Sequence, residues 1–289
     1  MEYKPDKLRD YIEKSELVTI NDNLKIRLSK ELLEEKYNKG AYNNRLTAIK
    51  NYIELINNLG IKYPGNAKPN FYLYIVPDDN FVELLNYPSH RSNSGGGKPV
   101  DSYDLDSFNY AFGLSSNKLD GTYELNEIGT IHELSHLVHS MFFSYRGRFI
   151  AEGFAESLPL YIMDYQSKFD EHREILKTLT KDQILSANEL VILEKEQNFN
   201  AGAVIPNESV TFDYSYISSY LFVRGCMEII ADKFKLDRVG AAQKFLEIVR
   251  LSKSMNQHLV FDIANALDVS KEELLNGKQM QLDIIKNLK

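Results

Sequence analysis

Ile131-His132-Glu133-Leu134-Ser135-His136-Leu137-Val138-His139 is the stretch on which the interpretation of this chain depends. It holds three of the chain's six histidines, and two of them frame a glutamate as His-Glu-x-x-His. Residues four apart in an α-helix lie about one turn apart on nearly the same face, so His132 and His136 can present their imidazoles to one ion. Glu133 then lies next to that ion without binding it.

Apolar residues recur around these histidines at intervals of three and four positions. The stripe consists of Ile128, Ile131, Leu134, Val138, Met141 and Phe142. This periodicity predicts an amphipathic helix that buries the stripe and carries the two histidines and the glutamate on another face. The alternative interpretation is that the histidines are ordinary polar side chains that bind nothing.

The residue types of the motif suit a hydrolytic zinc site. Neutral imidazoles are preferred ligands of Zn²⁺, and a catalytic zinc keeps one position open for a water whose pKa falls to about 7. Glu133 can take the proton of that water as it attacks a carbonyl and pass it to the leaving amine. Two histidines do not complete the set of protein ligands, so a third ligand is required.

A second acidic pair follows a short polar break at residues 144–150. It lies in Ala151-Glu152-Gly153-Phe154-Ala155-Glu156, where the two glutamates are again four residues apart and would share one face of a helix. One carboxylate could bind the metal while the other holds a ligand histidine by its second ring nitrogen.

The segment from His132 to Glu156 resembles the gluzincin metallopeptidases, the group of thermolysin-like and membrane-alanyl-aminopeptidase-like enzymes. In that group a helical His-Glu-x-x-His is followed by a glutamate ligand on the next helix. The resemblance implies that His132, His136 and Glu152 bind one zinc ion per chain, that Glu133 is the general base and that Glu156 supports a ligand histidine. Glu156 remains open as the third ligand, because its spacing from His136 is the commoner one in the family, whereas the Glu-Gly-Phe-Ala-Glu context favours Glu152.

The resemblance extends faintly to a tyrosine cluster at residues 211–224. In gluzincins, a tyrosine just ahead of a helix in the C-terminal lobe donates its hydroxyl to the oxyanion formed at the attacked carbonyl. Tyr216 matches that position best and Tyr214 is the alternate, although both could simply pack the start of the helix. His139 is a weaker candidate ligand, one turn beyond His136.

A strand predicted at residues 109–115 resembles the strand that lines the gluzincin cleft and pairs with an extended substrate. The aminopeptidases of the group carry a glutamate there for the free amine of the substrate. This chain has Phe112-Gly113-Leu114-Ser115-Ser116 instead. The missing acid argues against the ordinary aminopeptidase mode.

The expected fold class is α+β: a zincin-like two-lobed metallopeptidase fold with a small mixed sheet and the active-site helix packed on a mostly helical lobe. Residues 1–145 would form an α/β lobe with the metal-binding helix, and residues 146–289 a helical lobe that supplies the third ligand. Strands are expected within residues 17–28, 70–76 and 109–115, and the glycine-rich residues 92–99 are expected to be a flexible loop. Helices are expected at residues 46–59, 184–196, about 211–234, 239–252 and 256–267, and from the capping box of Ser270 and Glu273 onward.

Composition excludes several other classes of protein. The net charge of −7 argues against nucleic acid as the main partner, because phosphate binding requires a basic surface. The single cysteine, Cys226, excludes an internal disulfide framework and is expected to be a buried small hydrophobe. No apolar run reaches the length of a membrane span. The first residues, Met1 to Pro5, show no signal-peptide core, which points to the cytoplasm, or to an extracellular protein if a leader has been trimmed.

The sequence therefore predicts a zinc-dependent metallopeptidase that acts on a peptide or protein substrate. One alternative is a catalytically inactive metallopeptidase-fold binding or toxin-like module in which the metal is structural. Another is a helical interaction protein whose histidines meet no metal.

Overall fold

The computed structural model describes the backbone of residues 15–21, 24–29, 39–66, 71–77, 97–99, 110–119, 122–124, 127–143, 147–165, 170–196 and 214–288. Side chains are described at residues 47, 49–65, 131, 132, 134–143, 147–165, 174–196 and 214–288. The chain divides into two compact units, the first comprising Met1–Asn58 and Tyr63–Leu137 and the second Leu59–Lys62 and Val138–Lys289.

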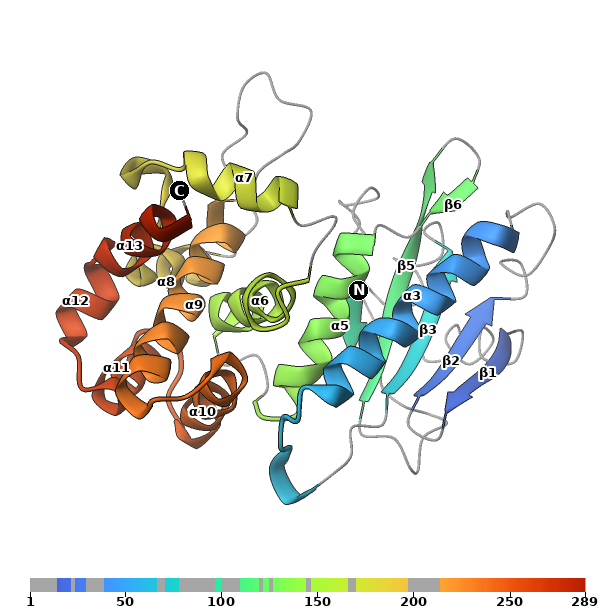
Figure 1. Ribbon diagram of the computed structural model, residues 1–289, viewed down its shortest axis with the longest axis horizontal. Helices are drawn as coiled ribbons and strands as arrows, with labels where there is room; N and C mark the ends of the chain where they lie inside the picture. The colour runs from blue at the N-terminus through green and yellow to red at the C-terminus, as the bar shows by residue number, and fades with distance from the viewer. Residues whose placement is uncertain are drawn as a thin grey trace. The chain divides into compact units, whose positions relative to one another are not determined.

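Among its described residues, the first unit contains strands, the helix α3 and most of the helix α5 (Figure 1). In chain order these are β1 (Ser15–Asn21), β2 (Leu24–Ser29), α3 (Lys39–Asn58), the 3₁₀ turn η1 (Pro64–Asn66), β3 (Phe71–Pro77), β4 (Gly97–Pro99), β5 (Tyr110–Leu119), β6 (Thr122–Glu124) and most of α5 (Glu127–Ser140). The strand order is β1-β2-β3-β5-β4, with β6 paired to β5. The pairs β2/β3 and β3/β5 are parallel, and the pairs of β1/β2, β4/β5 and β5/β6 are antiparallel.

The expected fold class is wrong for the part of the chain whose side chains the structure describes. Those residues are 80% helical and include no strand, so they do not form an α+β fold with a mixed sheet. The strands of the first unit are described as backbone alone. Apolar and aromatic runs in the sequence predict strands but say nothing of how a sheet packs, and packing is what defines the fold class.

The pairing of β5 also corrects the expected substrate-binding edge. Phe112, Gly113 and Leu114 pair with β3 on one side and with β4 on the other. An extended peptide needs a strand whose hydrogen-bonding groups are unpaired, so these three residues cannot be the edge to which substrate adds. Gly97–Pro99, expected within a flexible loop, form β4.

The second unit is helical throughout its described residues (Figure 1). Its elements are α6 (Arg148–Ser157), the π-helical turn η2 (Leu158–Ile162), α7 (Asp170–Thr178), the 3₁₀ turn η3 (Lys181–Gln183), α8 (Ala187–Lys195), α9 (Tyr214–Phe234), α10 (Arg238–Leu251), α11 (Asn256–Leu267), α12 (Lys271–Asn276) and α13 (Gln279–Leu288). Ser270 caps α12, which is one half of the predicted capping box, since its hydroxyl accepts a hydrogen bond from the backbone N–H of Glu273 at 3.3 Å. Cys226 is buried in α9, which confirms the expectation of a small hydrophobe.

The helix α6 packs more extensively on α9 than on any other element, and small residues allow the two to approach closely. A Cβ atom placed on Gly153 would lie 2.3 Å from the carbonyl oxygen of Ser219 and 2.7 Å from Cγ2 of Val223. The buried hydroxyls of Ser157 and Ser219 donate to the carbonyl oxygens of Gly153 and Ser215, four residues earlier in each helix. The contact therefore buries small side chains without leaving a hydroxyl unsatisfied.

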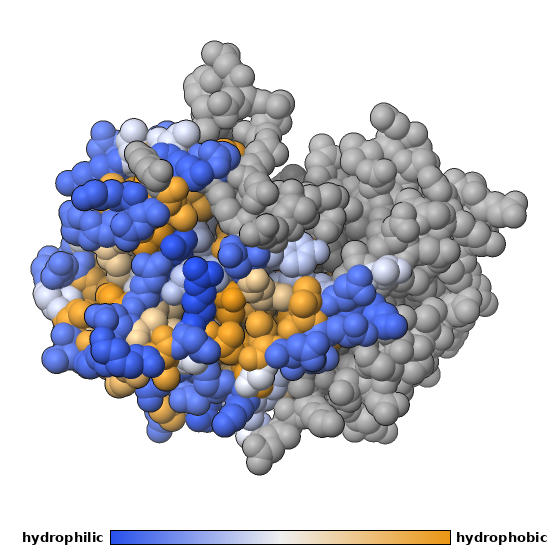
Figure 2. All heavy atoms as spheres, viewed as in Figure 1, coloured by the Kyte–Doolittle hydropathy of each residue, from blue (hydrophilic) through white to orange (hydrophobic). Residues whose placement is uncertain are grey.

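Figure 2 shows both hydrophilic and hydrophobic side chains on one face of the described helices. On the face shown in Figure 2, hydrophilic side chains cover much of the described surface, and hydrophobic ones gather in smaller areas between them. Among the residues that the structure describes, no helix combines the length and the apolar character needed to cross a membrane.

Candidate metal centre

Both histidines of the His-Glu-x-x-His motif lie on α5. Three residues of the predicted apolar stripe, Ile131, Leu134 and Val138, are no more than 3% exposed. Phe142, just beyond the helix, is also buried, whereas Met141 is half-buried and the side chain of Ile128 lies outside the described residues. His132 and His136 lie off that stripe but are also buried, at 8% and 3% exposure. The face that carries the imidazoles is thus withdrawn from solvent, which neither the periodicity nor the motif predicts.

Ser135, between the two histidines, ties α5 to α3. Its hydroxyl donates to the carbonyl oxygen of Ile131 at 2.8 Å, and the Tyr52 hydroxyl lies 2.8 Å from the same Oγ. A serine hydroxyl has one proton, so Tyr52 is the donor in the second bond. This buried bond opposes rotation of α5 about its axis and so helps to set the direction of the two imidazoles. No pattern in the sequence predicts this bond.

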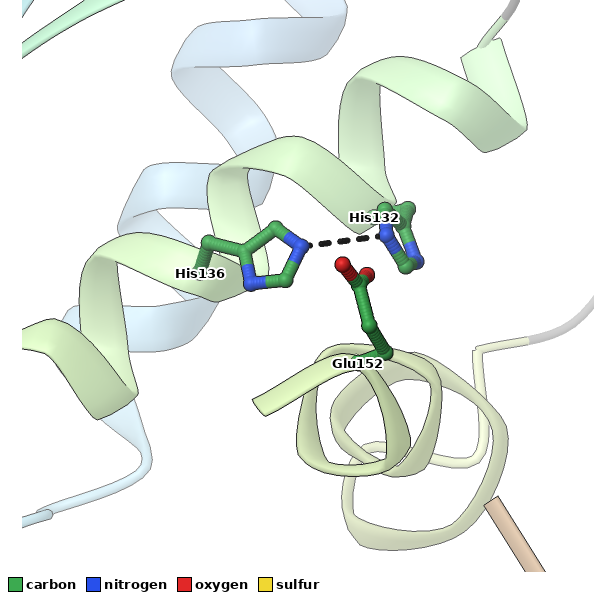
Figure 3. Close-up of side chains that lie close together, drawn as sticks. All are labelled: His132, His136 and Glu152. Carbon is green, nitrogen blue, oxygen red and sulfur yellow. Dashed lines mark hydrogen bonds between the residues drawn. The ribbon is translucent and has the colours of Figure 1, made fainter. Parts of the chain in front are cut away.

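The imidazoles of His132 and His136 and the carboxylate of Glu152 point toward one another (Figure 3). The Nε2 atoms of the two histidines are 3.1 Å apart. The rings meet edge to face, with 4.8 Å between centroids and an interplanar angle of 87°. One ligand atom from each of the three residues lies within 4.8 Å of the other two.

These residues fit a zinc ion. Zinc binds nitrogen and oxygen ligands at about 2.0–2.2 Å, so tetrahedral coordination separates neighbouring ligand atoms by roughly 3.4 Å. The two Nε2 atoms at 3.1 Å are already close to that separation. Two imidazole nitrogens and a carboxylate form a donor set found in catalytic zinc sites. Because all three residues are buried, an ion here would meet little competition from solvent at its protein ligands.

Local chemistry at the start of α6 positions Glu152. The N-cap, Gly147, is extended, and the first backbone N–H of the helix, that of Arg148, donates to Oε1 of Glu194 on α8 at 2.9 Å. A carboxylate at a helix N-terminus satisfies a backbone donor and complements the helix dipole. Glu152 lies one turn further along and is 5% exposed. The role of Glu194 depends on a contact 46 residues away in the chain, which no local sequence pattern predicts.

The guanidinium of Arg148 bonds the Glu152 carboxylate, with 3.3 Å between Nε and Oε1. It also forms a hydrogen bond with the side chain of Tyr216 on α9. Burial alone lowers the pKa of Arg148, but the charge of Glu152 and the interactions with Tyr216 raise it above its usual value. Arg148 therefore stays charged beside Glu152. The i, i+4 spacing of an arginine and a glutamate was the sequence signal that could have revealed this pair.

The three glutamates predicted to belong to the metal site differ in where their side chains lie. Glu152 belongs to the group that could hold a metal. Glu156, one turn beyond it on α6, is half-buried and is not a member of that group among the described residues. Glu133 follows His132 in α5, and its side chain lies outside the described residues. The proposed roles of Glu133 and Glu156 stay predictions.

The two tyrosines of the prediction have different neighbours. Tyr216 is half-buried in the first turn of α9 and bonds Arg148. The hydroxyl of Tyr214 accepts a hydrogen bond from Nε2 of Gln183 at 2.9 Å. Of the two, Tyr216 is thus linked to Glu152 through Arg148.

His139, the third histidine of the motif segment, packs among aromatic side chains. It is fully buried, stacks on Phe143 with 4.9 Å between ring centroids and an interplanar angle of 21°, and meets the edge of Phe154 at 6.3 Å. It is not a member of the group of possible ligands among the described residues. Its surroundings indicate a packing role.

Comparison of the chain with known protein families, with curated proteins and with solved structures finds no match. The functional assignment therefore rests on the residues and on their geometry.

Proposed function

We propose that this protein is a zinc-dependent metallopeptidase of the gluzincin type. The observation that carries the proposal is the convergence of His132, His136 and Glu152, two imidazole nitrogens and one carboxylate, at a buried point. The His-Glu-x-x-His sequence adds a second acid directly beside the first ligand. A purely structural zinc site needs no such residue, whereas hydrolysis requires a base.

In this proposal each residue has one role in the cleavage of a peptide bond. A bound zinc ion supplies Lewis acidity, which polarises a carbonyl group and activates water. Glu133 takes a proton from the attacking water and passes it to the leaving amine. The hydroxyl of Tyr216 donates a hydrogen bond to the oxyanion that forms at the attacked carbonyl. Tyr216 also forms a hydrogen bond with Arg148. A guanidinium has only donors, so the Tyr216 oxygen is the acceptor in that bond. The hydroxyl proton of Tyr216 is therefore still available for the oxyanion.

The burial of the three ligand residues is also compatible with a second candidate function. A structural zinc site is closed, and residues exposed by 8%, 3% and 5% suit such a site as well as a catalytic one. The protein would then be an inactive metallopeptidase-like module that binds a partner. The two candidates differ in whether peptide bonds are hydrolysed.

One substitution, Glu133→Gln, separates these functions. Untagged protein purified with zinc should contain about one zinc per chain, and Glu133→Gln should retain that zinc while losing hydrolysis of a mixed peptide library. If Glu133→Gln cleaves peptides as fast as the parent, Glu133 is not the general base. Zinc in both proteins with no cleavage by either would establish the structural-metal alternative.

The third ligand is tested by a matched pair on one helix. Glu152→Gln should lower the zinc content to background, whereas Glu156→Gln, one turn further along α6, should retain it. The reverse result would transfer the ligand role to Glu156. Anomalous scattering at the zinc edge from crystals of the parent would show directly which carboxylate contacts the ion.

A further inference from the structure

We propose that Arg148 is a built-in counter-ion of the third ligand, which pairs the charge of Glu152 when no metal is bound and opposes the metal when it binds. The inference rests on the proposed metal site, but it concerns the metal-free protein. It predicts that the site is preformed without metal and that Arg148 weakens zinc binding.

The metal-free protein needs a positive charge at this place. Glu152 is 5% exposed, and an ionised carboxylate buried without a partner is strongly unfavourable. Arg148, on the same helix, supplies this charge with its Nε 3.3 Å from Oε1 of Glu152. Its own side chain is 38% exposed, so the guanidinium stays partly solvated and loses little hydration energy there. The carboxylate can therefore remain charged and directed at the two histidines before any ion arrives.

A divalent cation at the same carboxylate changes the balance. The ion then pairs the charge of Glu152, and the guanidinium becomes a like charge close to it, which disfavours binding. Arg148 also orients the carboxylate, and that effect favours binding. The two effects have opposite signs, and a substitution that keeps the hydrogen bond while removing the charge separates them.

Arg148→Gln is that substitution. The amide nitrogen of glutamine is as many bonds from the backbone as the Nε of arginine, so it can donate to Oε1 of Glu152 from nearly the same position. Orientation is then retained and only the charge, together with the bond to Tyr216, is lost. The matched control is Arg224→Gln, because Arg224 bonds Glu228 four residues later on α9, at 2.8 Å, and also bonds Tyr220 at 2.9 Å.

The experiment measures thermal unfolding midpoints of the parent and both variants in chelator and in excess zinc, together with zinc affinity by competition with a chromophoric chelator. Arg148→Gln should lower the midpoint more in chelator than in zinc and should bind zinc about tenfold more tightly than the parent, which by thermodynamic linkage is a difference of about 1.4 kcal/mol. Arg224→Gln should lower both midpoints equally and leave the affinity unchanged.

Equal or weaker zinc binding by Arg148→Gln would overturn the inference, as would the same increase in Arg224→Gln. If Arg148→Gln folds in zinc but not in chelator, the result supports the inference, since it is the expected difference between the two conditions at its largest. If that variant folds in neither condition, Arg148→Lys decides, since it keeps a cation and should respond to zinc as the parent does; tighter binding by the lysine variant would overturn the inference. A parent that binds no zinc refutes the proposed function itself, whereas a zinc-binding parent with an unaltered Arg148→Gln refutes only the role of Arg148.

Discussion

Gly153→Ala tests the packing that holds the third ligand. The added Cβ would lie 2.3 Å from the Ser219 carbonyl oxygen and 2.6 Å from its carbon, both backbone atoms that cannot rotate away. An ordinary carbon–oxygen contact is about 3.4 Å, so α6 and α9 must separate by roughly 1 Å. Overpacking of this kind costs about 3 kcal/mol at the upper end of its usual range, and the better helix propensity of alanine returns about 1 kcal/mol. The net loss should be about 2 kcal/mol.

That loss should appear as a fall of roughly 4–8 °C in the unfolding midpoint of the metal-free protein. Because Glu152 is the neighbour of Gly153, the displaced helix should also weaken zinc binding at least about tenfold, since a ligand carboxylate moved by about 1 Å no longer matches zinc geometry. Gly240→Ala is the control: its Cβ would approach only side-chain atoms, the nearest being Oδ1 of Asp237 at 3.1 Å. Gly153→Ala as stable as the parent would refute the reasoning about the α6–α9 contact.

Three further predictions concern residues beyond that contact. Tyr52→Phe removes the buried hydroxyl that donates to Ser135, so it should lower the free energy of unfolding by about 1 kcal/mol in urea titrations; no measurable change would show that the bond does not brace α5. Burial alone raises the pKa of Glu189, but hydrogen bonds from Ser186 and Lys278 lower it below its usual 4.5. Since the folded pKa is the lower one, Glu189 stabilises the fold above pH 4.5 and this contribution is lost as the pH falls below it, so Glu189→Gln should flatten the fall in stability measured in acid. Burial raises the pKa of Cys226, so the thiol should react with a disulfide reagent only as the protein unfolds; reaction within seconds in the folded state would contradict its burial.

The sequence was sufficient for features that depend on a few neighbouring residues. The three- and four-residue periodicity around His132 predicts α5 and its buried stripe, because helical geometry is set by local hydrogen bonds. The cap of α12 at Ser270 follows from the same local chemistry. The motif also identifies the two histidines as a pair, since residues four apart in a helix must lie on one face.

The fold class was beyond the sequence because it depends on how elements pack. The expected α+β class does not describe the residues whose side chains are placed, which are helical and contain no strand. The expectation that the strand at residues 109–115 offers a substrate edge is wrong at residues 112–114 for a related reason. Whether a strand has an unpaired side depends on β4, a three-residue segment with no strand signal of its own.

The sequence by itself determined the chemical types available to this site: two imidazoles one helical turn apart, a glutamate beside them and a pair of acids further along the chain. Tertiary structure alone decided that Glu152 rather than Glu156 lies with the histidines, that all three are buried, and that Arg148 and Tyr216 stand next to the carboxylate. The physical reason is that side-chain spacing within one helix is fixed by the backbone. The approach of one helix to another is set instead by close packing, as between α6 and α9 at Gly153, and a linear pattern does not record it.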